Sequence, residues 1–511
     1  MTIELSGDLL SKIDRTTPLY QKLVTANEKL ALKDPNIWGE KAKTEAAIRL
    51  NWVDLPITSF ELINVLKTLI AKFSGKDRLV LCGMGGSSLA PEVLAATYRK
   101  PIFILDSTDP NYVSHSLSGD LSRTVVLISS KSGSTIETTS QRAFFEAEFM
   151  AAKLNPTEHI VFCTDPNSPL DIDSRAKGYE VINADPNVGG RFSALSAFGL
   201  TPAALLGISI EEILNSAKST RGQLGEKFNP AIDVAYLLAT QSDQYLAFAD
   251  TDLMPGLSDW IEQLIAESTG KEGVGRIPIV IESINAVIGS DQIRIGFDGT
   301  GDLSVQGDLA SQFLFWEWCT ALLGAALEID PFNQPNVTEA KLQTGKLLAE
   351  WNGQLPKFIC DALDKDIEIF GHTDSVSTEL NYLINSIPKD GYIAITAYLD
   401  RKDDAKVLQL REILAKKSGR PVTFGWGPRF LHSTGQFHKG GQPNGVFLQL
   451  TGSVTKDLAI PGQDYGFEQL VMAQALGDGR ALLERSYPIS RLHLRDRKVG
   501  IDQLLETAIK L

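Results

Sequence analysis

Apolar and polar residues follow one another along the chain in a rhythm that predicts alternating strands and helices. Between residues 56 and about 215, short apolar runs are separated by longer stretches of helical periodicity. The apolar runs lie near residues 78–82, 101–106, 123–129, 159–163 and 179–183. Because unbroken apolar runs are typical of strands buried on both faces, this pattern predicts a doubly wound parallel sheet.

A second set of elements begins near residue 230. Its strands are predicted near 277–282, 291–297, 391–398, 421–425 and 445–450, and its helices near 256–268, 308–328, 404–418 and 466–485. Before residue 55 the pattern is helical and amphipathic. Trp38, Leu50 and Trp52 are the expected anchors of that segment onto the main body.

The predicted fold class is therefore α/β, with two doubly wound parallel-sheet domains. At 511 residues the chain exceeds the size of one core, so more than one domain is expected. We expect a helical N-terminal segment (1–55), a first, phosphate-binding domain (56–220), and a second domain with a C-terminal extension (221–511). The boundary near 215–230 depends only on a change in the set of motifs, because no linker-like stretch marks it.

Composition narrows the classes of function. The net charge is −14, which disfavours binding to nucleic acid or to an anionic membrane. No apolar run approaches the ~18 residues of a membrane-spanning helix, and the N-terminus lacks the core of a signal peptide. The four cysteines are far apart and lack metal-ligand spacing. We therefore expect free buried thiols, no metal site and a cytoplasmic location.

A hydroxyl-rich turn between a strand and a helix carries the most information. It reads Ser130-Lys-Ser-Gly-Ser-Thr135 and follows an apolar run. Free N–H groups at a helix N-terminus, the helix dipole and these side-chain donors together suit a phosphate monoester, and Lys131 adds positive charge. The alternative is a capped helix in a polar surface turn. A cap needs one such residue, whereas this turn offers five polar groups.

A glycine-rich turn, Gly83-Met-Gly-Gly-Ser-Ser88, occupies the same setting after the run at 78–82. Glycines permit close approach of the backbone to a ligand, and Ser87 and Ser88 can cap the helix that follows. A dinucleotide-binding loop is the alternative, although the third glycine of that fingerprint is missing. Two such turns predict one polar ligand held at neighbouring strand ends.

These two turns together resemble the sugar-isomerase (SIS) phosphosugar domain. Three further motifs resemble the glucose-6-phosphate isomerase family: Gly189-Gly-Arg-Phe-Ser193, Glu267-Ser-Thr-Gly-Lys271, and Asp330-Pro-Phe-Asn-Gln334 running on to Lys341. The motifs occur in family order over roughly residues 75–345. The segment after residue 420 resembles the isomerase half of fused transaldolase–isomerase proteins.

The resemblance implies reversible aldose–ketose isomerisation of glucose 6-phosphate to fructose 6-phosphate through a cis-enediol, a step of glycolysis and gluconeogenesis. It also implies SIS-type, flavodoxin-like domains, a phosphosugar substrate, a homodimer, and a reaction without cofactor or metal. The residues that it assigns to the substrate are Gly86, Ser87, Ser130, Lys131, Ser132, Ser134, Thr135 and Gln334.

Proton transfer between neighbouring carbons needs a carboxylate within reach and shielded from water. Glu267 ends an apolar helical stretch and precedes the break at Gly270, which suits a tuned base. Arg191 follows two glycines and can supply a fixed positive charge for the enediolate oxygen. From the residues alone, two alternatives stay open. Glu267 can pair with Lys271 four residues on, and Arg191 can pair with a surface acid.

Gln334 and Lys341 lie seven residues apart, which is about two helical turns. Both side chains share one face if a helix runs between them, and Pro335 in the first turn permits that helix. By resemblance, Lys341 assists at the ring oxygen and Gln334 orders the sugar. The alternative for Lys341 is a solvated helix lysine.

A histidine for ring opening is missing from its place in the better-known branch of the family, since residues 268–333 contain none. The glycine-rich loop Leu431–Gly441 holds both His432 and His438, and such loops are a usual place for catalytic groups. We favour His438, because its Thr-Gly-Gln-Phe-His context is similar to the family's Asn-Gly-Gln-His, with His432 second. A loop histidine with purely structural hydrogen bonds is the alternative.

Two other functions stay open at this point. A phosphosugar-sensing module without catalysis would keep the two serine turns but need not keep Glu267, Arg191 and Lys341 together. The other is a different phosphosugar enzyme, such as an isomerase acting on an amino-sugar phosphate or mannose phosphate. Nothing in the sequence separates glucose from mannose, because the difference lies in the contact to one hydroxyl.

Overall fold

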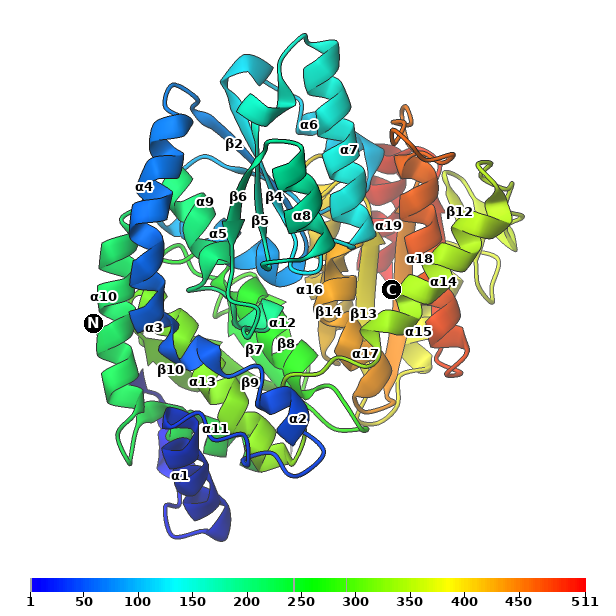
Figure 1. Ribbon diagram of the computed structural model, residues 1–511. Helices are drawn as coiled ribbons and strands as arrows, with labels where there is room; N and C mark the ends of the chain where they lie inside the picture. The colour runs from blue at the N-terminus through cyan, green and yellow to red at the C-terminus, as the bar shows by residue number, and fades with distance from the viewer. Residues whose placement is uncertain (1, 242–243, 291) are drawn as a thin grey trace.

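The computed structural model describes residues 2–241, 244–290 and 292–511, and these residues form three sheets with helices packed around them (Figure 1). The first sheet has strand order β3-β2-β4-β5-β6, with all neighbours parallel. Its strands are β2 (Arg78–Gly83), β3 (Phe103–Leu105), β4 (Thr124–Ser129), β5 (Ile160–Thr164) and β6 (Glu180–Asn183). All five strands predicted from the apolar runs are confirmed, with ends shifted by at most two residues.

Helices cover both faces of this sheet, which explains why its strands are apolar throughout. Val126 and Phe162 pack in one cluster with Phe145 of α7 (Ile136–Ala151). The alternate residue Leu127 belongs to another cluster, together with Phe198 of α9 (Ala197–Leu205). The doubly wound arrangement is therefore confirmed, because side chains alternate between the two faces of a strand.

The strand order determines where a ligand can lie. The chain builds β2 and β3 in one direction across the sheet, then returns to place β4 on the other side of β2. This is the flavodoxin-like order, whose ligand lies outside the carboxyl ends of the strands at the point of reversal. Here that point lies between β2 and β4, so the glycine-rich turn and the hydroxyl-rich turn meet at it.

The strands after residue 221 are divided between two sheets, whereas the sequence pattern presented them as one set. The second sheet has order β1-β10-β9-β7-β8 and is parallel except for β1. The third has order β11-β12-β16-β15-β13-β14, with β11 and β12 antiparallel to their neighbours. Their edge strands β8 and β14 contact each other. Residue 291, at the start of one predicted strand, lies outside the described residues.

The bounds of the elements agree with most of the sequence predictions and add strands that were not predicted. The second sheet comprises β1 (Glu4–Ser6), β7 (Tyr245–Ala249), β8 (Ile277–Ile281), β9 (Gln292–Gly296) and β10 (Leu303–Gln306). The third comprises β11 (Ala362–Asp364), β12 (Ile367–Phe370), β13 (Tyr392–Tyr398), β14 (Val422–Trp426), β15 (Gly445–Gly452) and β16 (Ile489–Leu494). Strands β1, β7, β10, β11, β12 and β16 are the ones that were not predicted.

The four helices predicted in the second half of the chain are present. They are α12 (Leu257–Thr269), α13 (Leu309–Leu327), α16 (Gln409–Ser418) and α18 (Phe467–Leu483). Besides α7 and α9, the other α-helices of the described residues are α1 (Pro18–Ala31), α2 (Lys43–Ala46), α3 (Leu55–Thr58), α4 (Leu62–Lys72), α5 (Leu89–Thr97), α6 (Pro110–His115), α8 (Pro169–Ala176), α10 (Ile210–Leu224), α11 (Pro230–Thr240), α14 (Val337–Trp351), α15 (Val376–Asn385), α17 (Gly435–Gly440) and α19 (Arg497–Lys510). Among the described residues, no helix has both the length and the apolar character needed to cross a membrane.

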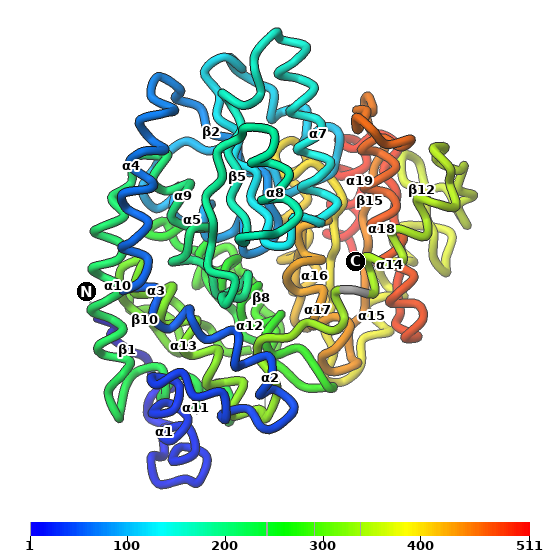
Figure 2. The backbone as a smooth tube through the Cα atoms, viewed as in Figure 1, coloured from blue at the N-terminus to red at the C-terminus, as the bar shows by residue number. Residues whose placement is uncertain are grey.

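The N-terminal segment runs along the outside of the body from α1 past α2 to α4 (Figure 2). Its predicted anchors are confirmed, because Trp38, Leu50 and Trp52 are all buried. The ring of Trp52 lies against those of Phe192 and Trp318, so the segment packs on the wall of the functional site described below. Of the four free cysteines, Cys82, Cys163 and Cys319 are buried as expected, whereas Cys360 is only partly buried.

Candidate active site

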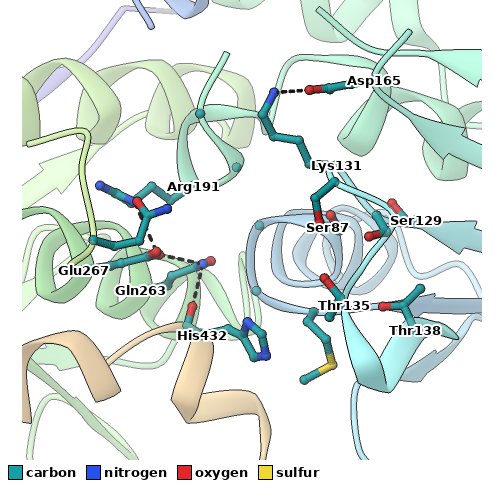
Figure 3. A pocket seen from close by; sticks show the side chains of 18 of the residues that line it. Ser87, Ser129, Lys131, Thr135, Thr138, Asp165, Arg191, Gln263, Glu267 and His432 are labelled. Atoms are coloured by element: carbon teal, nitrogen blue, oxygen red, sulfur yellow. Dashed lines mark hydrogen bonds and ion pairs between the residues drawn. The ribbon is translucent and has the colours of Figure 1, made fainter. Parts of the chain in front are cut away.

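A cavity of about 390 Å³ lies between the carboxyl edge of the first sheet and helix α12. Besides Glu45, Arg49 and Asp165, six segments contribute residues to its lining (Figure 3). They are the turn Gly85–Ser87, the turn after β4, the turn Gly190–Phe192, α12 itself, the loop around residues 332–334, and the turn Arg429–His432. Most of the residues that the sequence singled out therefore come together in one place.

The hydroxyl-rich turn is left open toward the cavity. Thr135 is the N-cap of α7, and its side chain makes no cap hydrogen bond, so the amides of the first helical turn stay available to a ligand. Ser132 and Ser134 are exposed, and their Oγ atoms lie 3.0 Å from each other. Ser130, Ser132 and Thr135 line this cavity, whereas Ser134 lines a neighbouring one. The arrangement is that of an anion site at a helix N-terminus.

Lys131 has a partner of its own. Its Nζ lies 2.6 Å from Asp165 Oδ2 and also donates to the carbonyl of Pro186 at 3.0 Å. Figure 3 shows its side chain directed toward Asp165 and away from Thr135. Burial raises the pKa of Asp165 above its usual range, although the contact with Lys131 opposes this. The positive charge expected at the turn is thus partly neutralised.

The glycine-rich turn packs against the turn that carries Arg191. A Cβ atom on Gly86 would lie 2.0 Å from the carbonyl oxygen of Gly190, so only glycine fits where the two turns touch. Ser87 lines the cavity as expected. The expected capping of α5 by serine is wrong, because the N-cap Ser88 instead donates its hydroxyl to the carbonyl of Gly85.

Glu267 and Arg191 form the most constrained part of the site. Glu267 Oε1 lies 3.1 Å from Arg191 Nη1, and Glu267 Oε2 accepts a hydrogen bond of 3.1 Å from Gln263. Arg191 also donates to the Ser268 hydroxyl at 2.8 Å and to Gln334 Oε1 at 3.0 Å. Both oxygens of the carboxylate are therefore held at fixed positions, on a side chain that remains 11% exposed to the cavity.

The structure shows neither of the two alternative pairings, Glu267 with Lys271 or Arg191 with a surface acid. Lys271 does not pair with Glu267, because its buried Nζ donates to the carbonyls of Asp330 and Asn333. Burial lowers the pKa of Lys271 well below its ordinary value. Burial also lowers the pKa of Arg191, although Glu267 opposes this. Arg191 donates to carbonyls of the same loop at 2.7 and 3.0 Å, so the two cations hold that loop in place.

The two candidate histidines have opposite environments. His432 lines the cavity, and its Nε2 lies 3.0 Å from Glu137 Oε1. His438 is buried among aromatic rings, with Nδ1 2.8 Å from the hydroxyl of Tyr392, and it is not among the residues that line the cavity. Burial lowers the pKa of His438 to about 3. The preference for His438 over His432 is therefore corrected, because only His432 faces the cavity.

Gln334 and Lys341 do not share a helix face, because the condition for it, a helix running from one to the other, is not met. Helix α14 begins at Val337, and Gln334 precedes it. Gln334 lines the main cavity, where it accepts from Arg191. Lys341 lines an adjoining cavity of about 230 Å³, which shares Thr135 and His432 with the first. Arg191 and Lys271 bind the backbone carbonyls just before Gln334, in the loop that leads to this helix.

Several cavity residues escaped the sequence analysis. Gln263 donates both to Glu267 and, at 2.8 Å, to the carbonyl of His432. Its position four residues before Glu267 on one helix was the available signal. Ser129 and Thr138 place buried hydroxyl oxygens at the cavity, and neither oxygen has a hydrogen-bond partner among the described residues. Glu137 lay within a recognised motif, but its contact with His432 joins residues 295 positions apart.

A buried ion network holds the turn that carries His432. Arg429, three residues before it, lies 2.8 Å from Glu92 Oε2 of α5, while Arg401 lies 2.8 Å from Glu92 Oε1. Asp106 contacts both arginines, at 3.2 and 3.5 Å. Burial opposes ionisation of Glu92, but the two arginines outweigh it and lower its pKa to about 2. The network ties the third sheet to the first at the edge of the site.

Comparison with known proteins places this geometry in context. No family model matches the chain. Its sequence is 31% identical over 238 residues to a glucose-6-phosphate isomerase of Campylobacter jejuni, covering 44% of this chain and 59% of that protein. It is 34% identical over 294 residues to a glucose-6-phosphate isomerase of Cyanothece sp., covering 53% of each. The chain thus spans about half the length of the curated relatives it matches.

The fold is also found in a solved structure. A glucose-6-phosphate isomerase from Chlamydia trachomatis superposes with a TM-score of 0.55 at 19% identity, covering 68% of this chain and 88% of that one. Because the identity is only 19%, this similarity is evidence for a shared fold and not for a shared activity. The resemblance predicted from the motifs is confirmed: this chain is similar in sequence to proteins named glucose-6-phosphate isomerase and shares the fold of one of them.

Proposed function

We propose that this protein is a glucose-6-phosphate isomerase, which interconverts glucose 6-phosphate and fructose 6-phosphate without a cofactor. The observation that carries the proposal is the pairing of Glu267 with Arg191 at 3.1 Å in a cavity whose other wall is an open anion site. A carboxylate, a fixed cation and a phosphate anchor at one cavity are what this isomerisation needs. Sequence similarity to proteins of that name supports the substrate.

The proposed chemistry moves one proton between neighbouring carbons. Glu267 takes the proton from C2 of the open-chain aldose, the carbonyl oxygen at C1 gains a proton, and a cis-enediol forms. The protonated Glu267 then returns a proton to C1 while the hydroxyl on C2 loses its own, which gives the ketose. Negative charge develops on the oxygens during both steps, and Arg191 beside Glu267 stabilises it. Its guanidinium is fixed by four other hydrogen bonds, so little reorganisation is required.

Ring opening precedes proton transfer and needs an acid and a base near the ring oxygen and the hydroxyl on C1. His432 suits this role because it lines the cavity with its Nε2 held by Glu137. Its own backbone carbonyl is linked through Gln263 to Glu267, so one amide side chain joins the ring-opening group to the base. Lys341 lines the adjoining cavity together with His432, which supports an auxiliary role at the ring oxygen.

The substrate phosphate is proposed to bind at the start of α7, through the amides of the first turn and the hydroxyls of Ser130, Ser132 and Thr135. Ser87 and the unpartnered hydroxyl of Thr138 complete the polar wall. The phosphate does not react, so these contacts hold ground state and transition state alike. By resemblance to the family, the working unit is a homodimer, which light scattering of the purified protein tests.

A coupled assay with chelator-treated, purified protein is the direct test. We expect turnover of glucose 6-phosphate and of fructose 6-phosphate without added metal or nucleotide. Binding of both sugar phosphates without turnover would contradict the proposal and favour a phosphosugar-sensing module. Faster turnover of mannose 6-phosphate or glucosamine 6-phosphate than of glucose 6-phosphate would shift the substrate assignment while keeping the reaction type.

A further inference from the structure

Away from the cavity, one histidine and two aspartates bring their side-chain ligand atoms together. His115 ends helix α6 beside the first sheet, while Asp400 and Asp403 lie in the loop that follows β13 of the third sheet. His115 Nε2 lies 3.0 Å from Asp400 Oδ2 and 3.1 Å from Asp403 Oδ2. The sequence predicted no metal site, because His115 and Asp403 are 288 positions apart.

Only one of the two carboxylate oxygens of Asp400, the buried acid of this cluster, accepts hydrogen bonds from the described residues. Asp400 is 1% exposed, and its Oδ1 accepts hydrogen bonds from the amides of Lys402 and Asp403. Its Oδ2 accepts no hydrogen bond from any residue that the structure describes, although it is directed at His115. One imidazole nitrogen carries at most one N–H, and here that group is aligned with Asp403. A buried carboxylate oxygen without a donor is costly, and a bound cation would satisfy it.

The two nearby arginines, Arg401 and Arg497, have other partners and do not supply that cation. Arg401, the residue between the two aspartates, is directed to Glu92 and Asp106. Arg497 pairs with Asp109 and Asp404. Two carboxylates therefore face a single imidazole, and the cluster keeps a net negative charge even when His115 is protonated. A divalent cation bound to the neutral imidazole would balance the charges of both carboxylates.

We propose that His115, Asp400 and Asp403 bind a divalent transition-metal ion, with Zn²⁺ as the best fit. Imidazole nitrogen with carboxylate oxygens is a usual ligand set for zinc, whereas magnesium and calcium prefer oxygen alone. Ligand atoms of a tetrahedral zinc ion lie about 3.4 Å apart, from bond lengths of about 2.0–2.2 Å. The two distances from His115 Nε2 therefore need only small adjustments. Asp403 is 63% exposed, so an ion can reach the cluster from solvent.

The ion would add a coordinate link between the first sheet and the third sheet. It links α6 of the first sheet to the loop after β13 of the third, next to the network of Arg401 and Glu92. Binding should therefore stabilise the folded protein, since the three ligands come together only on folding. This role is structural and independent of the proposed isomerase activity, because none of the three residues lines the cavity.

The test measures zinc binding by the full chain in a Cys360→Ser background, which removes the partly exposed thiol as a competing ligand. After chelator treatment, titration calorimetry should show one Zn²⁺ per chain and thermal unfolding should shift upward on zinc addition. His115→Ala and Asp403→Asn should each weaken zinc binding at least tenfold, because even the loss of an outer partner costs about 10–100-fold. Asp403 is exposed, so its change to asparagine leaves folding intact.

His372→Ala is the matched control. His372 is another partly exposed histidine beside a buried carboxylate, with Nδ1 3.4 Å from Glu379, but among the described residues no second acid joins them in a metal-like cluster. It should bind zinc as the parent does. Equal zinc affinity in the parent, His115→Ala and Asp403→Asn would overturn the proposal, and so would the absence of binding to the parent. Neither readout involves turnover, so failure here is distinct from failure of the proposed function.

Discussion

The two walls of the cavity are built in opposite ways. On the α12 side, Arg191 and Glu267 are 4% and 11% exposed, and each of their polar atoms has a protein partner. On the first-sheet side, Ser132 and Ser134 are exposed and bond mainly to each other, while the first turn of α7 keeps its amides unused. The α12 wall is therefore fixed without a ligand, whereas the first-sheet wall keeps hydrogen-bonding groups available to one.

This difference follows from what each wall is proposed to do. Groups that act on a developing charge accelerate a reaction only if they need no rearrangement when the charge appears. Groups that hold an inert phosphate need only a favourable contact, and exposed hydroxyls at a helix N-terminus supply it. Substitutions on the fixed wall should therefore affect turnover, whereas substitutions on the open wall should affect the capture of substrate.

The largest effect is expected for Glu267→Gln. The amide keeps the shape of the side chain but cannot accept the carbon-bound proton, so turnover should fall by about 10²–10⁴-fold. Exchange of the C2 hydrogen of the substrate with solvent should be lost as well, which proton NMR in deuterated water measures. Glu262→Gln is the matched control on the same helix. Burial raises the pKa of Glu262 well above its usual range, so the amide resembles its neutral form.

Equal loss of activity in both variants would mean that α12 is merely destabilised. Unchanged turnover in Glu267→Gln, with the fold intact by circular dichroism, would assign the base to another group. Either result would remove the distinction between a reactive wall and a binding wall, because the fixed carboxylate is its main evidence.

Strands and turns could be predicted well from the sequence, whereas contacts between distant segments could not. Apolar runs predicted the five strands of the first sheet within two residues, since burial on both faces imposes that pattern on each strand separately. The glycine-rich turn was predicted as a close approach to a ligand. Gly86 does line the cavity, but it is also held close to the turn of Gly190, whose carbonyl oxygen a Cβ on Gly86 would approach to 2.0 Å. No local pattern records that contact between distant segments.

The histidines show the same limit in another form. His432 and His438 share one glycine-rich loop, and local composition cannot say which of them faces the cavity. The outcome depends on Glu137 for one and on Tyr392 for the other, both far away in the sequence. Likewise, the spacing of Gln334 and Lys341 predicted a shared face only on condition of a helix between them. The helix begins only at Val337, after a loop whose carbonyl at Asn333 binds both Arg191 and Lys271.

The second prediction compares these two histidines directly. His432→Gln should slow isomerisation of the cyclic sugar by about 10²-fold, the lower end of acid–base assistance, because sugar rings also open without help. A substrate analogue that is already open-chain should recover much of this loss. His438→Asn keeps an acceptor for the Tyr392 hydroxyl and should isomerise both forms normally at pH 7. A defect confined to His438→Asn would restore the choice made from sequence.

The third prediction concerns the open wall. Thr135→Val removes one hydroxyl at the proposed phosphate site, and a hydrogen bond to a charged group contributes about 1.5–3 kcal/mol. We expect kcat/KM to fall by about 10–150-fold, with the loss in KM. Thr139→Val, one turn further along α7, is the control, because its hydroxyl donates to the carbonyl of Ile136 and does not line the cavity.

Lys131→Met sharpens the same comparison. Lys131 already pairs with Asp165 at 2.6 Å, so its removal leaves a partly buried carboxylate without its cation. We expect a lower midpoint in urea unfolding and a smaller loss of phosphosugar affinity than in Thr135→Val. An affinity loss larger than that of Thr135→Val, with unchanged stability, would show that Lys131 leaves Asp165 for the substrate phosphate.

The smallest effect is a change in how stability depends on pH, with no change in turnover. Burial holds the pKa of His438 at about 3, against an ordinary value of 6.5. Between these values the unfolded chain binds a proton at His438 that the folded chain does not, so acid favours unfolding. Stability should therefore rise as the pH increases from 3 to 6.5, and this histidine contributes at most about 1.4 kcal/mol per pH unit.

His438→Asn should reduce that slope between pH 5 and 6.5, where most carboxylates stay ionised, as measured by urea unfolding. His493, whose pKa burial lowers to about 4, keeps its own share of the slope in both proteins and serves as an internal reference. An unchanged slope in His438→Asn would mean that the ring is already accessible to protons in the folded state, and His438 would then return as a candidate for the cavity.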